Sequence, residues 1–414
     1  MPDCTTARAE VAASTAASTV AEAPAGGDGG LATLALTTAA IFGFATALTM
    51  VAPLLVDLSR DLHVSLGEAG LLSAAMSLPW AVGAPFTGAL SDRLGRRPLI
   101  VLALGGIGLA SVAAAGATDF AQLVGARAVA GLFGAFGPAS LFASVGDLYP
   151  PQRRGMAMGW LNMGFGLAAV LGVPAIGLVG GVLGWRAAFA ATGVLLLALG
   201  ALVQVGFPRV RPPRTERTIL ATYRAVLRVP YLGNVLWANL CERALFNGAV
   251  LYLPSFLILA YGLSTAGVAP PLALVAVGTI AGNVLGGWLG DRLPRAAIFV
   301  VAQAVCGVAG LALFGATVGL FVSVLVGALF GLVNASSRPA FLALSSELSA
   351  ENRGTVLGIL SLTNQGGAVL GSALGGLVIG FSGYGALGLA LAAVGAGAAC
   401  LALPLARRAA APAG

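Results

Sequence analysis

The sequence is poor in charge, histidine and cysteine, and each shortage excludes a class of protein. Only 9% of the 414 residues are charged and 58% are hydrophobic, which is far from the composition of a soluble globular protein. The single histidine, His63, and four scattered cysteines offer neither metal-ligand spacing nor a disulfide framework. We therefore expect a membrane protein with free cysteines, no metal site and no cofactor.

Two further absences bear on function. The formal charge is +7, but the arginines occupy short gaps between apolar runs, so the chain lacks the basic soluble face that nucleic-acid binding requires. It also lacks a phosphate-binding glycine loop followed by lysine, and a nucleophile, base and orienting group at usable spacing. We expect neither a nucleic-acid partner nor an enzyme.

Long apolar runs dominate the rest of the chain. Runs of about twenty residues match the length that a helix needs to cross a ~30 Å hydrocarbon core. The sequence predicts about twelve of them, and hence an all-α protein embedded in the lipid bilayer of the cell (inner or plasma) membrane. The expected spans are 31–56, 67–90, 97–117, 120–146, 155–180, 186–207, 231–260, 267–290, 296–316, 318–343, 354–380 and 384–405.

The gaps between spans predict orientation and domains. Arginines concentrate in alternate gaps, beginning with the one after the second span, so we place these gaps and both termini in the cytoplasm. The longest gap, 208–230, is proline- and arginine-rich and is predicted to be a cytoplasmic linker; binding to the membrane surface is a secondary possibility. It divides the chain into two six-helix bundles, 31–207 and 231–406. We expect a disordered tail at 1–30 and a cytoplasmic tail at 407–414.

An internal repeat supports this division. GALSDRLGRRP (88–98) follows the second span, and a similar GGWLGDRLPRA, containing Asp291, follows the eighth. DLYPPQRRGMAMG (147–159) is matched in the same way by ELSAENRGTVLG (347–358). Parallel six-span repeats are typical of transporters in which one half rocks against the other around a central site, and such a carrier needs only one chain. We therefore expect a functional monomer.

Three motifs resemble those of the major facilitator superfamily. They are GALSDRLGRRP (88–98), RAVAGLFGAFG (127–137) and MGFGLAAVLGVPAIG (163–177), in the last of which Val173 separates a Gly-Pro pair that many members have adjacent. The last motif is similar to that of the drug and metabolite:proton antiporter (arabinose-efflux-like) branch. The resemblance implies a secondary transporter, an exporter in an alternating-access cycle, for a branch that carries drugs, sugars, nucleosides and amino-acid-like metabolites.

The loops that follow spans two and eight are candidates for a cytoplasmic gate. Glycines there allow close helix approach, and an ion pair between helix ends would have to break on opening. The alternative is that these arginines only set the topology. The candidate gate residues are Gly88, Asp92, Arg93, Gly95, Arg96, Arg97, Asp291 and Arg292. In the fifth span, Gly172, Pro174 and Gly177 are interpreted either as a hinge or as ordinary helix packing.

The stretch WANLCERALFNGAVLYLP (237–254) places charges in the middle of a span. A charge at the membrane centre costs roughly 2.5–3.5 kcal/mol on insertion scales, so it needs a partner or a wet cavity. One face of this helix, a sector of about 140°, carries the polar groups. With Arg127 of the fourth span, the predicted substrate and proton cavity comprises Asn239, Glu242, Arg243, Phe246, Asn247 and Arg127.

The partner of Glu242 is predicted by depth. Adjacent helical residues point about 100° apart, so Arg243 is not expected to be that partner. Counting about 1.5 Å per residue brings Arg127 to a similar depth, and we predict an Arg127–Glu242 contact. Arg338 is expected nearer the inner end of its span, paired with Glu347 or serving the inner gate.

Three functional hypotheses remain open. In the first, the chain exports small organic molecules by proton antiport, because making and breaking the contact between Glu242 and an arginine changes its affinity for protons. The first span carries no carboxylate, so proton coupling would rest on Glu242, which could instead form a purely structural ion pair. The second hypothesis is an uncoupled or uptake carrier on the same fold, and the third is a non-transporting membrane sensor. Arg243 favours substrates with an anionic or hydrogen-bond-accepting group, and Phe246 and Trp237 suit an apolar part.

Overall fold

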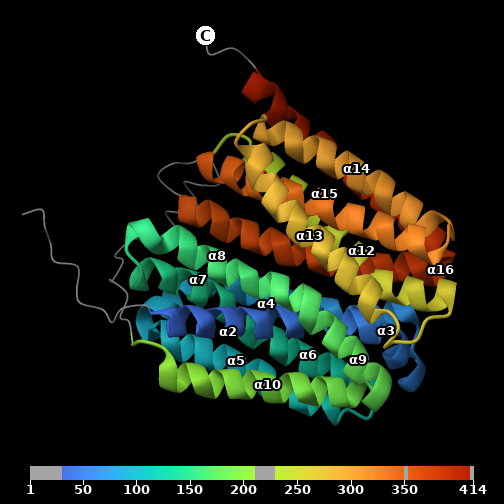
Figure 1. Cartoon of the computed structure of the whole chain (residues 1–414), viewed down its shortest axis with the longest axis horizontal. Coiled ribbons are helices and arrows are strands. Elements are labelled where there is room, and N and C mark those ends of the chain that lie inside the picture. Colours follow the sequence, from blue (N-terminus) through green and yellow to red (C-terminus); the bar gives the residue numbers. More distant parts are fainter. Residues whose placement is uncertain (1–29, 210–228, 349–352, 411–414) are drawn as a thin grey trace, which may run out of the picture.

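The regular structure is helical throughout the residues that the structure describes. This computed structural model describes residues 30–209, 229–348 and 353–410 (Figure 1). The first half of the chain contains α2 (Leu31–Thr49), α3 (Val51–Asp61), α4 (Leu66–Leu94), α5 (Arg96–Ala115), α6 (Phe120–Gly134), α7 (Gly137–Leu148), α8 (Pro151–Leu167), the π-helical turn η1 (Ala168–Gly172), α9 (Val173–Leu183) and α10 (Trp185–Gly206). The second half contains α12 (Leu232–Tyr261), α13 (Ala269–Gly290), α14 (Arg295–Gly315), α15 (Leu320–Glu347) and α16 (Arg353–Ala410).

The helices account for all twelve predicted spans. Within the described residues, 11 stretches are long and apolar enough to cross a membrane, and the last of them, Ile359–Arg407, has 49 residues. A continuous helix of that length would measure about 74 Å, more than twice the thickness of a bilayer core. Gly383, with φ 75° and ψ −173°, interrupts it and separates two helices. The predicted all-α membrane fold is therefore confirmed.

Some spans differ in detail from the prediction. Consecutive helices α2 and α3 form the first span, which runs to Asp61 rather than ending at 56. The fifth span contains η1, which ends two residues before Pro174, a residue with no N–H to donate to the preceding turn. The predicted tail 1–30 and linker 208–230 lie almost entirely outside the described residues, and α16 runs into the predicted tail at 407–414. The domain boundaries stay predictions.

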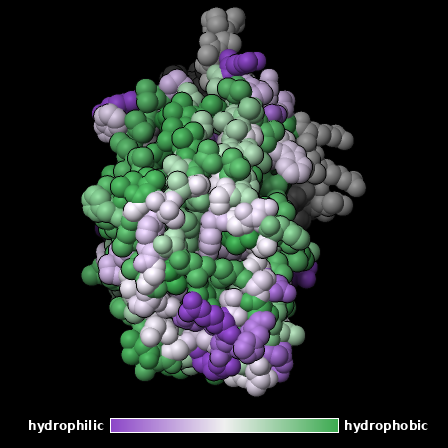
Figure 2. Space-filling view, turned by 90° about the vertical axis from the view of Figure 1, so that its right-hand side faces the viewer, coloured by the Kyte–Doolittle hydropathy of each residue, from purple (hydrophilic) through white to green (hydrophobic). Residues whose placement is uncertain are grey.

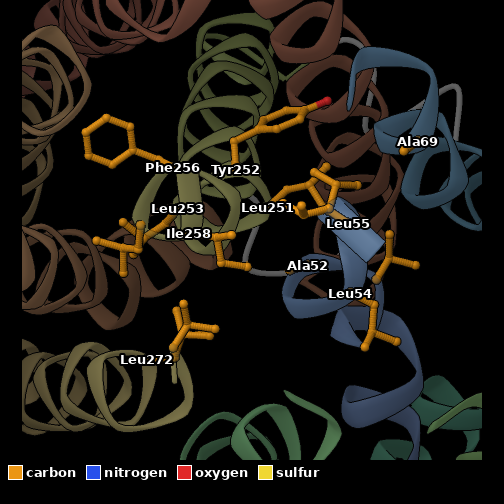
Figure 3. Packing of buried hydrophobic residues seen from close by; sticks show 14 of the residues in the cluster. Ala52, Leu54, Leu55, Ala69, Leu251, Tyr252, Leu253, Phe256, Ile258 and Leu272 are labelled. Carbon is orange, nitrogen blue, oxygen red and sulfur yellow. The ribbon is translucent and has the colours of Figure 1, made fainter. Parts of the chain in front are cut away.

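The two halves of the chain are packed together at one end of the bundle, which we call the closed end. One hydrophobic cluster there contains residues of α3 and α4 as well as residues of α12, α14 and α16. Figure 3 shows Leu54 and Leu55 of α3 on the side of α12 that carries Leu251 and Ile258. Figure 2 looks onto this end, where hydrophilic residues gather low on the face, over the first half.

Small residues allow the halves to approach closely at the closed end. A Cβ added at Gly67 of α4 would lie 2.9 Å from the carbonyl carbon of Gly376 in α16. A Cβ at Gly181 of α9 would lie 2.6 Å from the backbone nitrogen of Ala266. Glycine is therefore required at these contacts because no side-chain carbon fits between the backbones.

Apolar packing is organised differently at the opposite end of the bundle. There, one buried cluster contains only residues of the first half, including Ile100 and Leu148, and another contains only residues of the second half, including Leu232 and Phe341. Each half thus has its own core at this end, whereas the closed end has a shared one. Such packing lets two bundles pivot about a contact at one end without unfolding either.

Candidate functional site: a charged cluster at the middle of α12

Glu242 lies between the two kinds of core. It is ten residues beyond Leu232, the first residue of the 30-residue helix α12. Leu232 and Val235 belong to the core of the second half, and Leu245 onward belongs to the shared cluster at the closed end. Glu242 has no exposed surface. A carboxylate in this position requires hydrogen-bonding partners because burial removes its hydration.

Two arginines supply these partners. Arg243 donates from Nε to Glu242 Oε2 at 2.5 Å, and its Nη2 donates to Oε1 in a bidentate pair. Arg338 of α15 donates from Nη1 to Glu242 Oε2 at 3.0 Å. Charge-assisted hydrogen bonds of this kind are the strongest that a buried carboxylate can accept.

Amide side chains surround the three charges. Arg338 Nη1 also donates to Asn239 Oδ1 at 2.9 Å, and Asn239 Nδ2 donates to Thr363 Oγ1 at 2.6 Å and to Asn364 Oδ1 at 3.0 Å. Asn334 of α15 accepts a long contact of 3.4 Å from Arg243 Nη2. These contacts join α12, α15 and α16, and we call Asn239, Glu242, Arg243, Asn334, Arg338, Thr363 and Asn364 the charged cluster.

An apolar wall adjoins the charged cluster. The Arg243 guanidinium carbon lies 4.8 Å from the centre of the Phe246 ring, which is a cation–π distance. Phe246 is stacked on Phe330, with ring centres 6.5 Å apart and planes 9° from parallel. Both rings line a small hollow with Val250, Leu253 and Val275.

The structure corrects three predicted pairings. Arg127 does not contact Glu242; it is 1% exposed and donates to the carbonyl oxygens of Ala47 at 3.0 Å and Leu72 at 3.4 Å, within the first half. The Arg127–Glu242 contact was predicted because the two residues lie at similar depths in the membrane. Depth alone does not determine the direction in which a side chain points around its helix.

Glu242 and Arg243, which were not expected to pair, do so. Neighbouring Cα atoms are only about 3.8 Å apart, and the long arginine side chain folds back across that distance. Arg338 binds Glu242, whereas the predicted Glu347 pairs with Arg295 near the end of the bundle opposite the closed end.

The other predicted cavity residues divide into two groups. Asn239, Glu242 and Arg243 come together, and Phe246 lies beside them. Asn247 instead donates to the Arg243 carbonyl at 2.8 Å on its own helix. The sequence analysis missed Asn334, Thr363 and Asn364 and misplaced Arg338. Asn334 and Arg338 are four residues apart inside an apolar run, a spacing that puts both on one helix face. This spacing would have indicated a polar face on that helix, toward which Glu242 could point.

The predicted gate residues lie at the end opposite the closed end. Gly95 has φ 91°, a conformation that favours glycine, and forms the turn between α4 and α5. Arg96 donates to Asp147 of α7 at 2.8 Å and to Ser91 at 2.6 Å. The side chain of Asp92 lies outside the described residues.

The remaining gate candidates show local packing. A Cβ at Gly88 would meet nothing within 4 Å, and Arg93 is exposed. Arg97 Nε is enclosed without a partner among the described residues. Arg292 lies over the Trp288 ring at 4.1 Å on its own helix, beside the exposed Asp291. A gating role for these residues stays a prediction.

The fifth-span residues pack against two different neighbours. A Cβ at Gly172, the last residue of η1, would collide with the Thr46 side chain of α2. A Cβ at Gly177 would lie 3.2 Å from the Thr265 carbonyl oxygen in the second half. Gly177 therefore belongs to the contact between halves, next to the hydrogen bond from Thr265 Oγ1 to Asp57 Oδ2 at 2.7 Å.

Comparison with known proteins gives a consistent result. The sequence profile described as "Major Facilitator Superfamily" matches residues 37–347 and 271–413. The chain is 31% identical over 269 residues to the chloramphenicol resistance protein of Streptomyces lividans, covering 64% of this chain and 69% of that protein. It is 28% identical over 364 residues to the inner membrane transport protein YdhP of Escherichia coli strain K12, covering 84% and 92%.

Two further matches extend the comparison. A probable nitrate/nitrite transporter, NarK2 of Mycobacterium tuberculosis, is 29% identical over 279 residues, covering 64% of this chain and 67% of that protein. The solved structure of a bacterial homolog of the human lysosomal transporter Spinster, inward-facing and unoccupied, aligns with a TM-score of 0.69 at 18% identity. The alignment covers 91% of this chain and 94% of that one, and at this identity it shows the fold alone.

Proposed function

Because this chain belongs to the Major Facilitator Superfamily, a family of multi-pass membrane transporters, we propose that it carries small organic molecules across the cell membrane by alternating access around the charged cluster. One observation carries the proposal. A carboxylate of α12 with no exposed surface is bound by two guanidiniums, one from α12 and one from α15, and it lies between a core shared by both halves and a core of one half only. Buried charges at mid-membrane are typical of substrate and ion pathways.

Export in exchange for protons is the first candidate for direction and coupling. The arginine-rich gaps, which we place in the cytoplasm, belong to the end opposite the closed end. With its outer end closed, the carrier would be in the state that accepts a substrate from the cytoplasm. The similarity to a chloramphenicol resistance protein supports the same direction.

Glu242 is the group through which protons would couple in this candidate. In the present state both carboxylate oxygens are occupied by guanidinium donors. If α12 and α15 shift relative to one another when the closed end opens, Arg338 is drawn away from Glu242 and the buried carboxylate gains affinity for a proton. The return of Arg338 would release that proton on the other side.

The proposal is tested in everted membrane vesicles with an acidic interior reported by a pH-sensitive dye. Drugs, sugars, nucleosides and amino acids are added with and without the protein. A compound that dissipates the gradient only when the protein is present establishes coupled export. Glu242→Gln should abolish this signal, whereas Glu347→Gln, which changes an exposed carboxylate, should keep it. Transport of a labelled compound without proton movement would exclude proton antiport and would indicate an uncoupled carrier.

A second candidate, an uptake carrier, is favoured by the charge of the cluster. Two guanidiniums face one carboxylate, so one positive charge is left without a counter-ion among the described residues of the cluster. Such an excess attracts anions, and a probable nitrate/nitrite transporter is among the relatives. Uptake of a labelled anionic compound into right-side-out vesicles, driven by an inward proton gradient, would establish this candidate.

A further inference from the structure

The two arginines, and not the carboxylate, are the accessible part of the charged cluster. The side chains of Arg243 and Arg338 are each 16% exposed, whereas the Glu242 side chain is 0% exposed. An incoming molecule therefore reaches the arginine side chains before the carboxylate.

Each guanidinium has donors to spare. Arg243 uses Nε and Nη2 on Glu242, and Arg338 uses Nη1 and Nη2 on Glu242, Asn239 and Asn364. The hydrogen bonds of these two side chains to the described residues leave Arg243 Nη1 and Arg338 Nε unused, although a guanidinium offers five N–H donors in all. An unoccupied pair of donors on adjacent guanidiniums matches a carboxylate or a similar oxyanion.

An enclosed amide lies beside the carboxylate. Asn334 is 1% exposed, its Oδ1 is contacted by Arg243, and its side chain neighbours Glu242 and the Cys306 thiol. The carboxylate is therefore enclosed by polar groups on its far side, and the donors of the arginines are the ones left for a ligand. The apolar wall of Phe246 and Phe330 continues from the same arginine.

We propose that the charged cluster binds an organic monoanion with an aromatic or apolar body, and that this anion binds together with a proton. The anionic group lies on Arg243 and Arg338, and the body lies against Phe246 and Phe330. The proposal rests on the proposed function in taking the charged cluster as the substrate site, and it favours the second candidate over export in exchange for protons.

Charge explains why the anion and the proton assist each other. The ionised cluster carries one net positive charge, and an anion on the spare donors of the arginines offsets the positive charge that keeps Glu242 ionised. With that charge offset, Glu242 takes up a proton from water more readily. By linkage, a ligand that promotes protonation of Glu242 binds more tightly when Glu242 is protonated.

The groups that face Glu242 leave no other titrating candidate of this kind among the described residues. On α12 and α15 they are Arg243 and Arg338, and α14 contributes the buried thiol of Cys306. From α16 the neighbours of the cluster are the uncharged Thr363 and Asn364. The proton taken up with the anion is therefore assigned to Glu242.

The test compares two ligands of the same shape. The purified full-length protein in lipid nanodiscs is titrated by calorimetry with 1-naphthoate and with the neutral 1-naphthamide at pH 7, where a simple carboxylate, with a pKa of about 4, is ionised. We expect naphthoate to bind at least tenfold more tightly. Repeating the titration in buffers of different ionisation enthalpy gives the number of protons taken up, which should lie between zero and one for naphthoate and be zero for naphthamide.

Variants separate the two parts of the proposal. In Glu242→Gln, naphthoate should bind without proton uptake, and its affinity should not change between pH 8 and 6. In the wild type, affinity should rise by up to about tenfold per unit fall in pH. Arg243→Gln should weaken naphthoate binding at least tenfold, whereas Arg186→Gln, at an exposed ion pair with Asp61, should not.

The possible failures are distinguishable. Equal affinity for naphthoate and naphthamide, or binding of neither, overturns the anion site in the wild type, where folding of a variant is not in question. Naphthoate binding without proton uptake overturns the linkage. If naphthoate binds with proton uptake but no compound is transported in vesicles, this inference stands and alternating-access transport is the claim that fails.

Discussion

Replacing Gly67 by alanine should move the protein away from its closed-end conformation. The new Cβ would lie 2.9 Å from the carbonyl carbon of Gly376, whereas carbon atoms in contact are about 3.5–4.0 Å apart. Both atoms belong to helix backbones, so α4 and α16 must separate by roughly 0.5–1 Å. Overpacking of this kind costs about 1–3 kcal/mol, which corresponds to a shift of roughly five- to 150-fold in the equilibrium between closed and open forms.

Spin labels at Thr118 and Thr317 would report this shift. The first lies between α5 and α6 and the second between α14 and α15, in loops whose neighbours Phe120 and Leu320 pack on the closed-end cluster. With the native cysteines replaced, pulsed electron resonance should show a larger population of long distances in Gly67→Ala.

Gly105→Ala is the matched control for this experiment. A Cβ there would meet nothing within 4 Å, so the distance distribution should stay that of the parent protein. Identical distributions in Gly67→Ala and Gly105→Ala would refute the reasoning that this glycine contact holds the two halves together.

Three further predictions concern local contacts. Tyr252→Phe removes a 2.6 Å hydrogen bond to the Ser372 carbonyl and should lower the free energy of unfolding by about 1 kcal/mol in a thermal melt; an unchanged melt would contradict it. Gly95→Ala places a side chain at φ 91° and should destabilise by about 1–3 kcal/mol, seen as a lower melting temperature and yield. Arg338→Gln removes a 3.0 Å charge-assisted hydrogen bond but leaves Glu242 paired with Arg243, and it should destabilise by about 1.5–3 kcal/mol in the same melt.

The spans could be predicted because the bilayer imposes a simple rule of length and apolarity. The family resemblance is confirmed by the profile match, and even the break near 383 agrees with the predicted gap between 380 and 384. The extension of the first span to Asp61 was missed because Asp57 and Arg60 read as its outer boundary, although the helix continues past both.

The residues of the charged cluster were predicted in part. Hydrophobic context alone showed that Glu242 and Arg243 needed partners, and both lie in the charged cluster. The identity of the partner could not be obtained in the same way, because it depends on how α15 is rotated against α12. Arg127, the predicted partner, points into the first half, whereas Arg338 points toward Glu242. Depth along the membrane gives no information about the direction of a side chain around the helix bundle.

The most direct test of the account is the transport, in everted vesicles, of whichever panel compound the wild-type protein carries. It should be measured for Arg243→Gln and for the matched control Arg186→Gln, which changes an arginine at the closed end outside the charged cluster. If the charged cluster is the transport site, the first variant loses at least tenfold in initial rate and the control keeps the wild-type rate. Equal rates in both variants would show that the substrate binds elsewhere.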